Sequence, residues 1–222
     1  TGVNFHGYKN MVGTFYPAER VEIYPSVLTT LSDREYRSGL AEVIKAALLG
    51  DEELLSILER EREAVLRRDA SVLEELLWRS VAVKAAVVQE DLRESGRRAI
   101  LNLGHTYGHA LESVTSFDRY SHGEAVAWGI GRAMVLGGRL GITPEAYRSR
   151  VGQLLRGYGY SLEPVQLPAA ALLEAMGHDK KREGERLRFV VQRELCQTEI
   201  VSVDRSIVEE SLAGTVETRY DQ

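Results

Sequence analysis

Three of the five histidines in this chain lie within residues 102–124. His105 and His109 are four residues apart, so on a helix their imidazoles project from one face, one turn apart. His122 follows after a short loop. Two stacked imidazoles and a third from the next segment can hold a divalent metal, typically zinc, if a carboxylate completes the set. The spacing alone also fits a polar helix whose histidines share no role.

Further polar residues stand where they would join this group. Arg98 lies four residues before Asn102, which lies three before His105, so one continuous helix would place them on the face that carries both histidines. Such a cluster is rarer than a lone histidine and favours a site. Earlier in the chain, Glu42 and Lys45 interrupt a helix face of otherwise small or apolar residues. This pattern indicates a helix covered on both sides, with its two charged groups facing a site.

A lysine at position 84 interrupts an otherwise apolar helical run. Lys84 either extends to the surface or lies in a cavity where it meets an anion, and the sequence leaves both open. The unusual polar residues together are Lys9, Asn10, Glu42, Lys45, Lys84, Arg98, Asn102, His105, His109, His122 and Lys180. Glu42, His105 and His122 would supply one oxygen and two nitrogens and leave coordination positions open, as in catalytic metal sites.

The charge around such a metal indicates the class of substrate. Four lysines and an arginine match a ligand that carries phosphate and carboxylate groups rather than an apolar one. The metal would polarise a hydroxyl or carbonyl oxygen, and a nearby histidine would move protons. These residue types therefore predict an enzyme that acts on an anionic small molecule.

Composition excludes several other classes. The 222 residues are 44% hydrophobic and 27% charged with a net charge of −5, which is typical of a globular protein. The basic residues are dispersed, so we expect no nucleic-acid partner. No uncharged apolar run approaches the roughly 20 residues of a membrane helix. The single Cys196 cannot form an internal disulfide, which favours the cytoplasm. Because the chain opens in what reads as mid-loop, we expect it to be a segment of a longer protein.

Hydrophobic periodicity predicts a mainly α fold with a minor β-hairpin component. Helices are expected at 33–49, 51–68, 71–91, 122–140, 144–157, 169–176 and 206–214, a short strand at 21–24, and a hairpin from 187–191 and 199–203. Thr143 and Pro144 predict an N-cap and first helical position. Trp78, Tyr107 and Trp128 are expected in the core. Strands and helices do not alternate as a parallel sheet would require.

Several of these segments resemble the signatures of the 3-dehydroquinate synthase family. They are GLAEVIK at 39–45, the VKAAVV run around Lys84, NLGHTYGHALE at 102–112 and SHGEAVAWG at 121–129. The opening TGVNFHGYKNMVGTFYP and the late DKKREGERLRFVV fit the same family, so the resemblance is collinear over essentially the whole chain. Departures are FHGY at 5–8, in a variable stretch, and Pro25, where acidic residues are common.

The resemblance implies one mostly helical metal- and substrate-binding domain over residues 1–222. Residues 1–25 would be a linker or edge segment from an upstream NAD-binding α/β domain of the same parent chain, which this chain lacks. Glu42, His105 and His122 would bind Zn²⁺ (or Co²⁺), and His109 would contact substrate and handle protons. The implied substrate contacts are Lys45, Lys84, Arg98, Asn102 and Lys180, with Lys181 as the alternative register. The implied contacts to NAD or the substrate beside it are Lys9, Asn10, Val27, Leu28, Thr29 and Thr30.

The implied activity is a carbon–oxygen lyase reaction of the shikimate pathway of aromatic amino-acid biosynthesis. It is the NAD- and metal-dependent cyclisation of 3-deoxy-D-arabino-heptulosonate 7-phosphate to 3-dehydroquinate, with elimination of phosphate, in a cytoplasmic homodimer. One alternative is a related sugar-phosphate cyclase, and a more distant one is a metal-dependent alcohol dehydrogenase with a similar helical domain. The third alternative is a fragment that binds metal but is inactive without its NAD domain.

Overall fold

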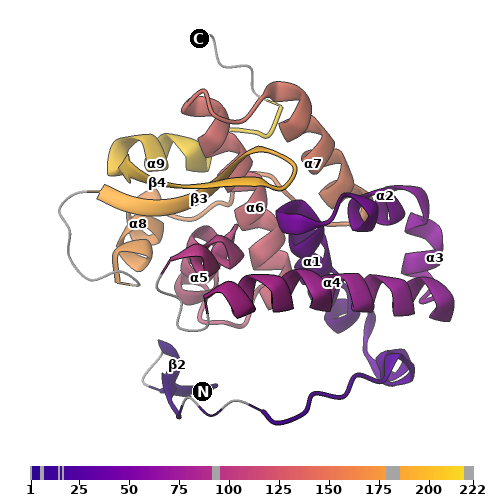
Figure 1. The fold of residues 1–222 in the computed structure, drawn as a ribbon. Coiled ribbons are helices and arrows are strands. Elements are labelled where there is room, and N and C mark those ends of the chain that lie inside the picture. The colour runs from indigo at the N-terminus through magenta and orange to yellow at the C-terminus, as the bar shows by residue number, and fades with distance from the viewer. Residues whose placement is uncertain are drawn as a thin grey trace.

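A computed structural model describes residues 2–5, 8–14, 16, 18–91, 96–178 and 186–217 (Figure 1). Its helices are α1 (Asp33–Gly50), α2 (Glu52–Arg60), α3 (Arg62–Leu66), α4 (Ala70–Glu90), α5 (His105–Val114), α6 (His122–Arg139), α7 (Glu145–Gly157), α8 (Ala169–His178) and α9 (Arg205–Ala213). Short 3-10 helices are η1 (Pro25–Thr30) and η2 (Arg97–Asn102), and the strands are β1 (Val3–Phe5), β2 (Tyr8–Val12), β3 (Arg186–Glu194) and β4 (Gln197–Asp204). The predicted mainly α class with a minor β component is confirmed.

Helix α6 is the centre of this arrangement. It is buried almost all round from Gly123 to Gly137, and it contacts α1, α5, α7, α9 and β3. One hydrophobic cluster, with Leu48 and Ile130, lies on its α1 side, and another, with Tyr107, lies on its α5 side. A helix that is apolar on every face must be covered on every face. None of the described helices is long and apolar enough to cross a membrane.

The backbones of α5 and α6 touch at glycines. Gly104, just before α5, has φ +79°, and a Cβ there would lie 2.8 Å from both the carbonyl oxygen of Val126 and the nitrogen of Ile130. On α6, a Cβ at Gly129 would lie 2.0 Å from the carbonyl oxygen of Gly104. Only glycine combines the left-handed conformation with this approach. The contact fixes how the start of α5 sits against α6.

The predicted hairpin is confirmed as β3 and β4, an antiparallel pair in which Leu187 faces Val203. Strand β3 packs against α6, and β4 contacts α9 (Figure 1). Buried Gln192 ties the hairpin to two helices: its Nε2 donates to the carbonyl oxygen of Leu48 at 2.7 Å, and its Oε1 accepts from the hydroxyl of Tyr147 at 2.9 Å. These hydrogen bonds satisfy a buried amide and hold α1, α7 and the hairpin together.

The predicted strand at 21–24 is wrong. Residues 18–24 have no regular secondary structure, and η1 follows them. Val21 is 76% exposed, and no described segment pairs with this run. A β-prone sequence becomes a strand only where a partner edge and a packing surface exist. Conversely, β1 and β2 pair within the opening stretch that we expected to be a loop.

Three local predictions also need correction. The helix expected at 51–68 breaks at Glu61 (φ −102°, ψ 21°), which separates α2 from α3. The N-cap of α7 is Pro144, with extended backbone (φ −61°, ψ 146°), instead of Thr143. The Thr143 hydroxyl does not cap the helix and donates to the carbonyl oxygen of Gln192 at 2.5 Å. Trp78 is 71% exposed rather than core, since it lies on the face of α4 opposite buried Leu76. Tyr107 and Trp128 are buried as predicted.

We predict that Gly129→Ala lowers the free energy of unfolding by about 1–3 kcal/mol, since the added methyl group forces the α5 and α6 backbones apart. The control is Gly39→Ala on α1, where a Cβ would meet nothing within 4 Å. That change should raise the free energy of unfolding by roughly 0.5–1 kcal/mol through helix propensity. Urea denaturation of both variants measures the difference, and equal stabilities would contradict the close contact.

Candidate metal centre and adjoining cleft

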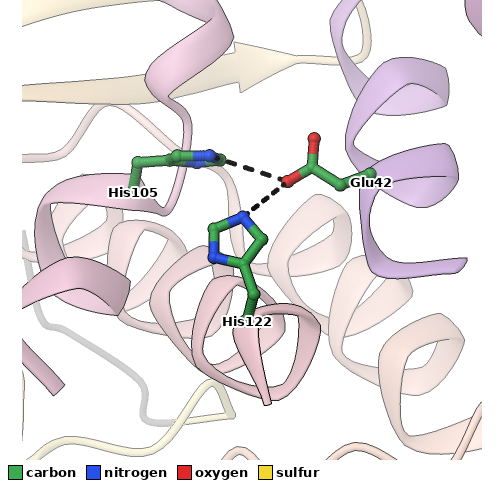
Figure 2. Close-up of side chains that lie close together, drawn as sticks. All are labelled: Glu42, His105 and His122. Atoms are coloured by element: carbon green, nitrogen blue, oxygen red, sulfur yellow. Dashed lines mark ion pairs between the residues drawn. The ribbon is translucent and has the colours of Figure 1, made fainter. Parts of the chain in front are cut away.

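Three helices bring one carboxylate and two imidazoles together (Figure 2). Glu42 lies in the middle of α1, and His105 and His122 are the first residues of α5 and α6. The Oε1 atom of Glu42 is 3.6 Å from Nε2 of His105 and 3.5 Å from Nε2 of His122. The three residues predicted as metal ligands therefore share one point in space, although they are far apart in the sequence.

The Nδ1 atom of each histidine faces an acceptor. Nδ1 of His105 lies 3.3 Å from the carbonyl oxygen of Leu103, and Nδ1 of His122 lies 3.3 Å from Oε1 of Glu112. These acceptors favour the tautomer with its proton on Nδ1. The lone pair of each Nε2 is then directed at Glu42, as a metal ligand requires.

The two oxygens of Glu42 have different surroundings. Oε2 forms an ion pair with Nζ of Lys45 at 2.8 Å. Oε1 is buried and has no hydrogen-bond donor among the described residues. Burial raises the pKa of Glu42 and the charge of the paired Lys45 lowers it, and this pKa lies well below its ordinary value. A buried, charged oxygen without a donor is costly, so this atom fits a site for a cation.

His105 is neutral at physiological pH. Burial, reinforced by the charge of Lys45, lowers the pKa of His105 to about 3. A deprotonated imidazole and an ionised carboxylate are the forms that bind a divalent metal. Ligands about 2.0–2.2 Å from a tetrahedral ion lie roughly 3.3–3.6 Å apart, which agrees with the two distances to Oε1 of Glu42. The residues therefore fit a zinc-like ion with three protein ligands.

This centre lies in the wall of a cleft of about 840 Å³, a volume suited to a small-molecule ligand. The predicted residues that line the cleft are Glu42, Lys45, Lys84, Arg98, Asn102, His105, His109 and His122. The cleft thus carries three basic side chains beside the candidate ligands. Basic groups gathered in a concave site favour phosphate or carboxylate ligands.

The predicted continuous helix through Arg98, Asn102 and His105 is wrong. The first two lie on η2, and the chain turns at Gly104 before α5 begins at His105. Both still line the cleft, because η2 packs against α1 and α4, which contribute other residues of the lining. The sequence left open whether Lys84 reaches the surface or lies in a cavity. Both hold, because Lys84 is exposed and also lines the cleft.

His109 lies beside the centre. Its ring centroid is 5.1 Å from that of His105 and 6.2 Å from that of His122. It lines the cleft but does not belong to the group that surrounds Oε1 of Glu42. This position is compatible with the predicted contact to substrate, and the role in proton transfer stays a prediction.

The other residues predicted to contact NAD or substrate are not among the described residues that line the cleft. Residues 27–30 belong to η1, which packs against α4 and does not line the cleft. The side chains of Lys9 and Asn10 lie outside the described part of the structure, as do Lys180 and Lys181. Their assignment to NAD or substrate, and the choice between the two late lysines, stay predictions.

Sequence reasoning missed Glu112, whose carboxylate contacts Nδ1 of His122. A signal was available, because Glu112 lies three residues after His109 and seven after His105, on the same helix face. It also missed Ser80, Val81 and Val83, with which α4 lines the cleft. Nothing in their residue types distinguishes these three from core positions.

A carboxylate and two imidazoles on a helical scaffold, facing a basic cleft, are the arrangement expected of a domain that binds a metal ion and an anionic small molecule. The 3-dehydroquinate synthase C-terminal family model matches residues 39–182, and the 3-dehydroquinate synthase N-terminal family model matches residues 1–38. The chain belongs to the 3-dehydroquinate synthase family.

Curated relatives are similar along most of this chain. The 3-dehydroquinate synthase of Azotobacter vinelandii is 44% identical over 221 residues, which are 99% of this chain and 59% of the relative. The 3-dehydroquinate synthase of Acidithiobacillus ferrooxidans is 44% identical over 193 residues, which are 87% of this chain and 53% of the relative. The chain therefore spans little more than half the length of these relatives.

Two solved structures share the fold. A 2-epi-5-epi-valiolone synthase from Streptomyces hygroscopicus subsp. jinggangensis 5008, with NAD⁺ and Zn²⁺ bound, has a TM-score of 0.85 at 28% identity and covers 96% of this chain and 59% of its own. A 2-deoxy-scyllo-inosose synthase complexed with carbaglucose-6-phosphate, NAD⁺ and Co²⁺ has a TM-score of 0.82 at 23% identity and covers 95% of this chain and 60% of its own. The second similarity supports the fold alone.

We predict that Glu42→Gln weakens Zn²⁺ binding by more than the roughly 10- to 100-fold typical of outer-shell changes, because a neutral amide replaces a charged ligand. Competition with a chromophoric chelator at pH 7 measures the affinity. The control, Glu35→Gln, makes the same change at an exposed position in the first turn of α1 and should leave the affinity unaltered. Equal affinities for the two variants would exclude Glu42 as a ligand.

We predict that the metal-free chain loses stability below neutral pH through His105. Because its pKa is lowered to about 3 from about 6.5 when unfolded, its contribution is complete above pH 6.5 and declines as the pH falls toward 3. Between pH 7 and pH 5 the free energy of unfolding should fall by about 2 kcal/mol more for the wild type than for His105→Gln. Urea denaturation with a chelator present measures this, and parallel pH profiles would contradict it.

Proposed function

We propose that this chain is the metal- and substrate-binding part of a 3-dehydroquinate synthase, a carbon–oxygen lyase that acts on phosphates. The observation that carries the proposal is the convergence of Glu42, His105 and His122 within a basic cleft. Membership of the family and the names of its relatives support the same activity. The cofactors would be NAD and Zn²⁺ or Co²⁺, because one similar structure has NAD⁺ and Zn²⁺ bound and the other has NAD⁺ and Co²⁺ bound.

The proposed substrate is 3-deoxy-D-arabino-heptulosonate 7-phosphate, and the product is 3-dehydroquinate. The substrate carries a phosphate, a carboxylate and hydroxyl groups. Lys45, Lys84 and Arg98 supply positive charge along the cleft, which suits the two anionic groups. The amide of Asn102 suits a hydroxyl, since it both donates and accepts. Lys180 would add a further cation.

The proposed mechanism assigns each side chain a limited task. Glu42, His105 and His122 would hold the ion, which supplies Lewis-acid polarisation of a substrate oxygen. Lys45 neutralises the outer oxygen of Glu42 at 2.8 Å and would present its remaining donors to the substrate. His109, on the same face of α5 as His105, would take up and return a proton at a substrate oxygen. The basic groups would orient the phosphate that is eliminated.

A related sugar-phosphate cyclase is the second candidate, favoured by the similarity to the valiolone synthase structure. Such enzymes would share the metal centre and differ in the groups that meet the substrate. Arg98, Asn102 and His109 in one cleft suit a carboxylated substrate, so we place this candidate second. A substrate that lacks the carboxylate distinguishes the two.

We further propose that turnover requires the region of the relatives that lies outside their match to this chain, since the match covers 59% of the Azotobacter relative. Residues 1–222 would act as one domain, with residues 1–25 linking it to an NAD-binding domain of the same parent chain. A cytoplasmic homodimer remains our expectation for the whole enzyme.

We predict that the chain alone binds Zn²⁺ but releases no phosphate from the heptulosonate phosphate. Fused behind the portion of the Azotobacter relative that precedes the match, and supplied with NAD and Zn²⁺, it should release phosphate, and a chelator should abolish this. A phosphate assay measures both, with a heptulose phosphate lacking the carboxylate as the comparison. Turnover by the 222 residues alone would overturn the two-part proposal, and preference for the uncarboxylated sugar would favour the related cyclase.

A further inference from the structure

A buried carboxylate stands behind the candidate metal centre. The side chain of Glu112 is only 4% exposed, and its two oxygens lie 3.3 and 3.4 Å from Nδ1 of His122. Glu112 does not line the cleft, whereas His122 does. The carboxylate therefore meets His122 from the protein side, while Nε2 of the same ring faces Glu42 in the cleft.

Glu112 could also act as a ligand, because Glu112, His109 and His122 form a second group of suitable atoms within 4.8 Å of one another. The two groups share His122 but differ in their carboxylate: Glu42 lines the cleft, whereas Glu112 is buried. An ion between Glu112 and Nδ1 of His122 would lie on the side of the ring away from Glu42 and would use a carboxylate that does not line the cleft. The geometry instead matches a carboxylate–histidine–metal relay, in which the outer carboxylate accepts the Nδ1 hydrogen.

The two histidines of the centre are held differently. His105 is 14% exposed in its side chain and donates to a neutral carbonyl oxygen, that of Leu103. His122 is 39% exposed and has a charged acceptor in Glu112. A hydrogen bond to a charged group is roughly twice as strong as a neutral one. The more exposed ring, which has more room to rotate, therefore has the stronger anchor.

The backbone around Glu112 is itself constrained. Glu112 lies near the end of α5, and its carbonyl oxygen accepts from the backbone nitrogen of Phe117 at 2.8 Å. Ser116 and Phe117 have φ values of 56° and 59°, so the chain turns sharply here before α6 begins at His122. The turn joins carboxylate and imidazole through a short connection, which limits their relative movement.

We propose that Glu112 is a positioning residue that fixes the tautomer and orientation of His122, so that its Nε2 is directed at a divalent cation held with Glu42 and His105. The inference rests on the proposed function, in that the three cleft residues bind a metal. A cation on Nε2 polarises the Nδ1–H bond toward Glu112, which offsets the cost of burying that carboxylate. Glu112 thus strengthens metal binding without touching the metal.

The test compares Glu112→Gln with Glu124→Gln in the 222-residue chain. Glu124 caps the start of α6 through the backbone nitrogen of Ser121, so the control makes the same charge change two residues from His122. Zn²⁺ and Co²⁺ affinities are measured by chelator competition, the Co²⁺ absorption spectrum reports coordination, and thermal melting with a chelator reports folding. Glu112→Gln should bind both metals about 10- to 100-fold more weakly with an altered Co²⁺ spectrum, and the control should match wild type.

A second measurement observes the tautomer of His122 in the wild-type chain itself. Long-range proton–nitrogen NMR spectra of the metal-free wild type, assigned with His122→Gln, should show His122 protonated at Nδ1 and not at Nε2. A ring protonated at Nε2, or equal metal affinity and spectra for Glu112→Gln and wild type, would overturn the positioning role. Failure of the wild-type chain to bind Zn²⁺ or Co²⁺ would overturn the proposed function instead, so the two failures are distinguishable.

Discussion

The candidate metal centre depends on a single buried carboxylate oxygen. Oε1 of Glu42 has two imidazole nitrogens within 3.6 Å and no hydrogen-bond donor among the described residues. Lys45 forms an ion pair with the other oxygen, Oε2. Oε1 therefore faces only the lone pairs of His105 and His122 among these neighbours. A charged oxygen atom that is shielded from water and has no donor needs a counter-charge. A divalent cation meets that need, so the local electrostatics and the proposed chemistry have the same origin.

The rest of the fold keeps the three ligands in place. Helix α6 is packed on all sides between two hydrophobic clusters, and its first residue is His122. The contact of Gly104 with Gly129 sets the height and rotation of α5 on α6, and with it the position of His105. Close-packed interiors resist small displacements. The hairpin and the later helices cover α6 and supply no ligand, yet the spacing within the centre depends on them.

The cleft divides its tasks between two walls. One wall, from α1, α5 and α6, carries the candidate metal ligands, and the other, from α4 and η2, carries Lys84, Arg98 and Asn102. A metal that polarises one end of a substrate and cations that hold its anionic groups must stand a fixed distance apart. Rigid helices provide that spacing better than loops would. The same division suits several sugar phosphates, which is why the family fold by itself leaves the substrate to be tested.

Local periodicity determined much of this protein from its sequence alone. Long helices such as α1, α4 and α6 follow from residue spacing, because side chains three or four apart share a helix face, and the β3–β4 hairpin follows from its β-branched runs. The candidate ligands Glu42, His105 and His122 stood out by residue type and by the resemblance to the family, because they lie on three separate helices. Only tertiary structure decided the turn at Gly104, the exposure of Trp78, the unpaired run at 21–24 and the contact of Glu112 with His122. Each of these depends on which distant segment lies alongside, and a pairing across space leaves no period in the sequence.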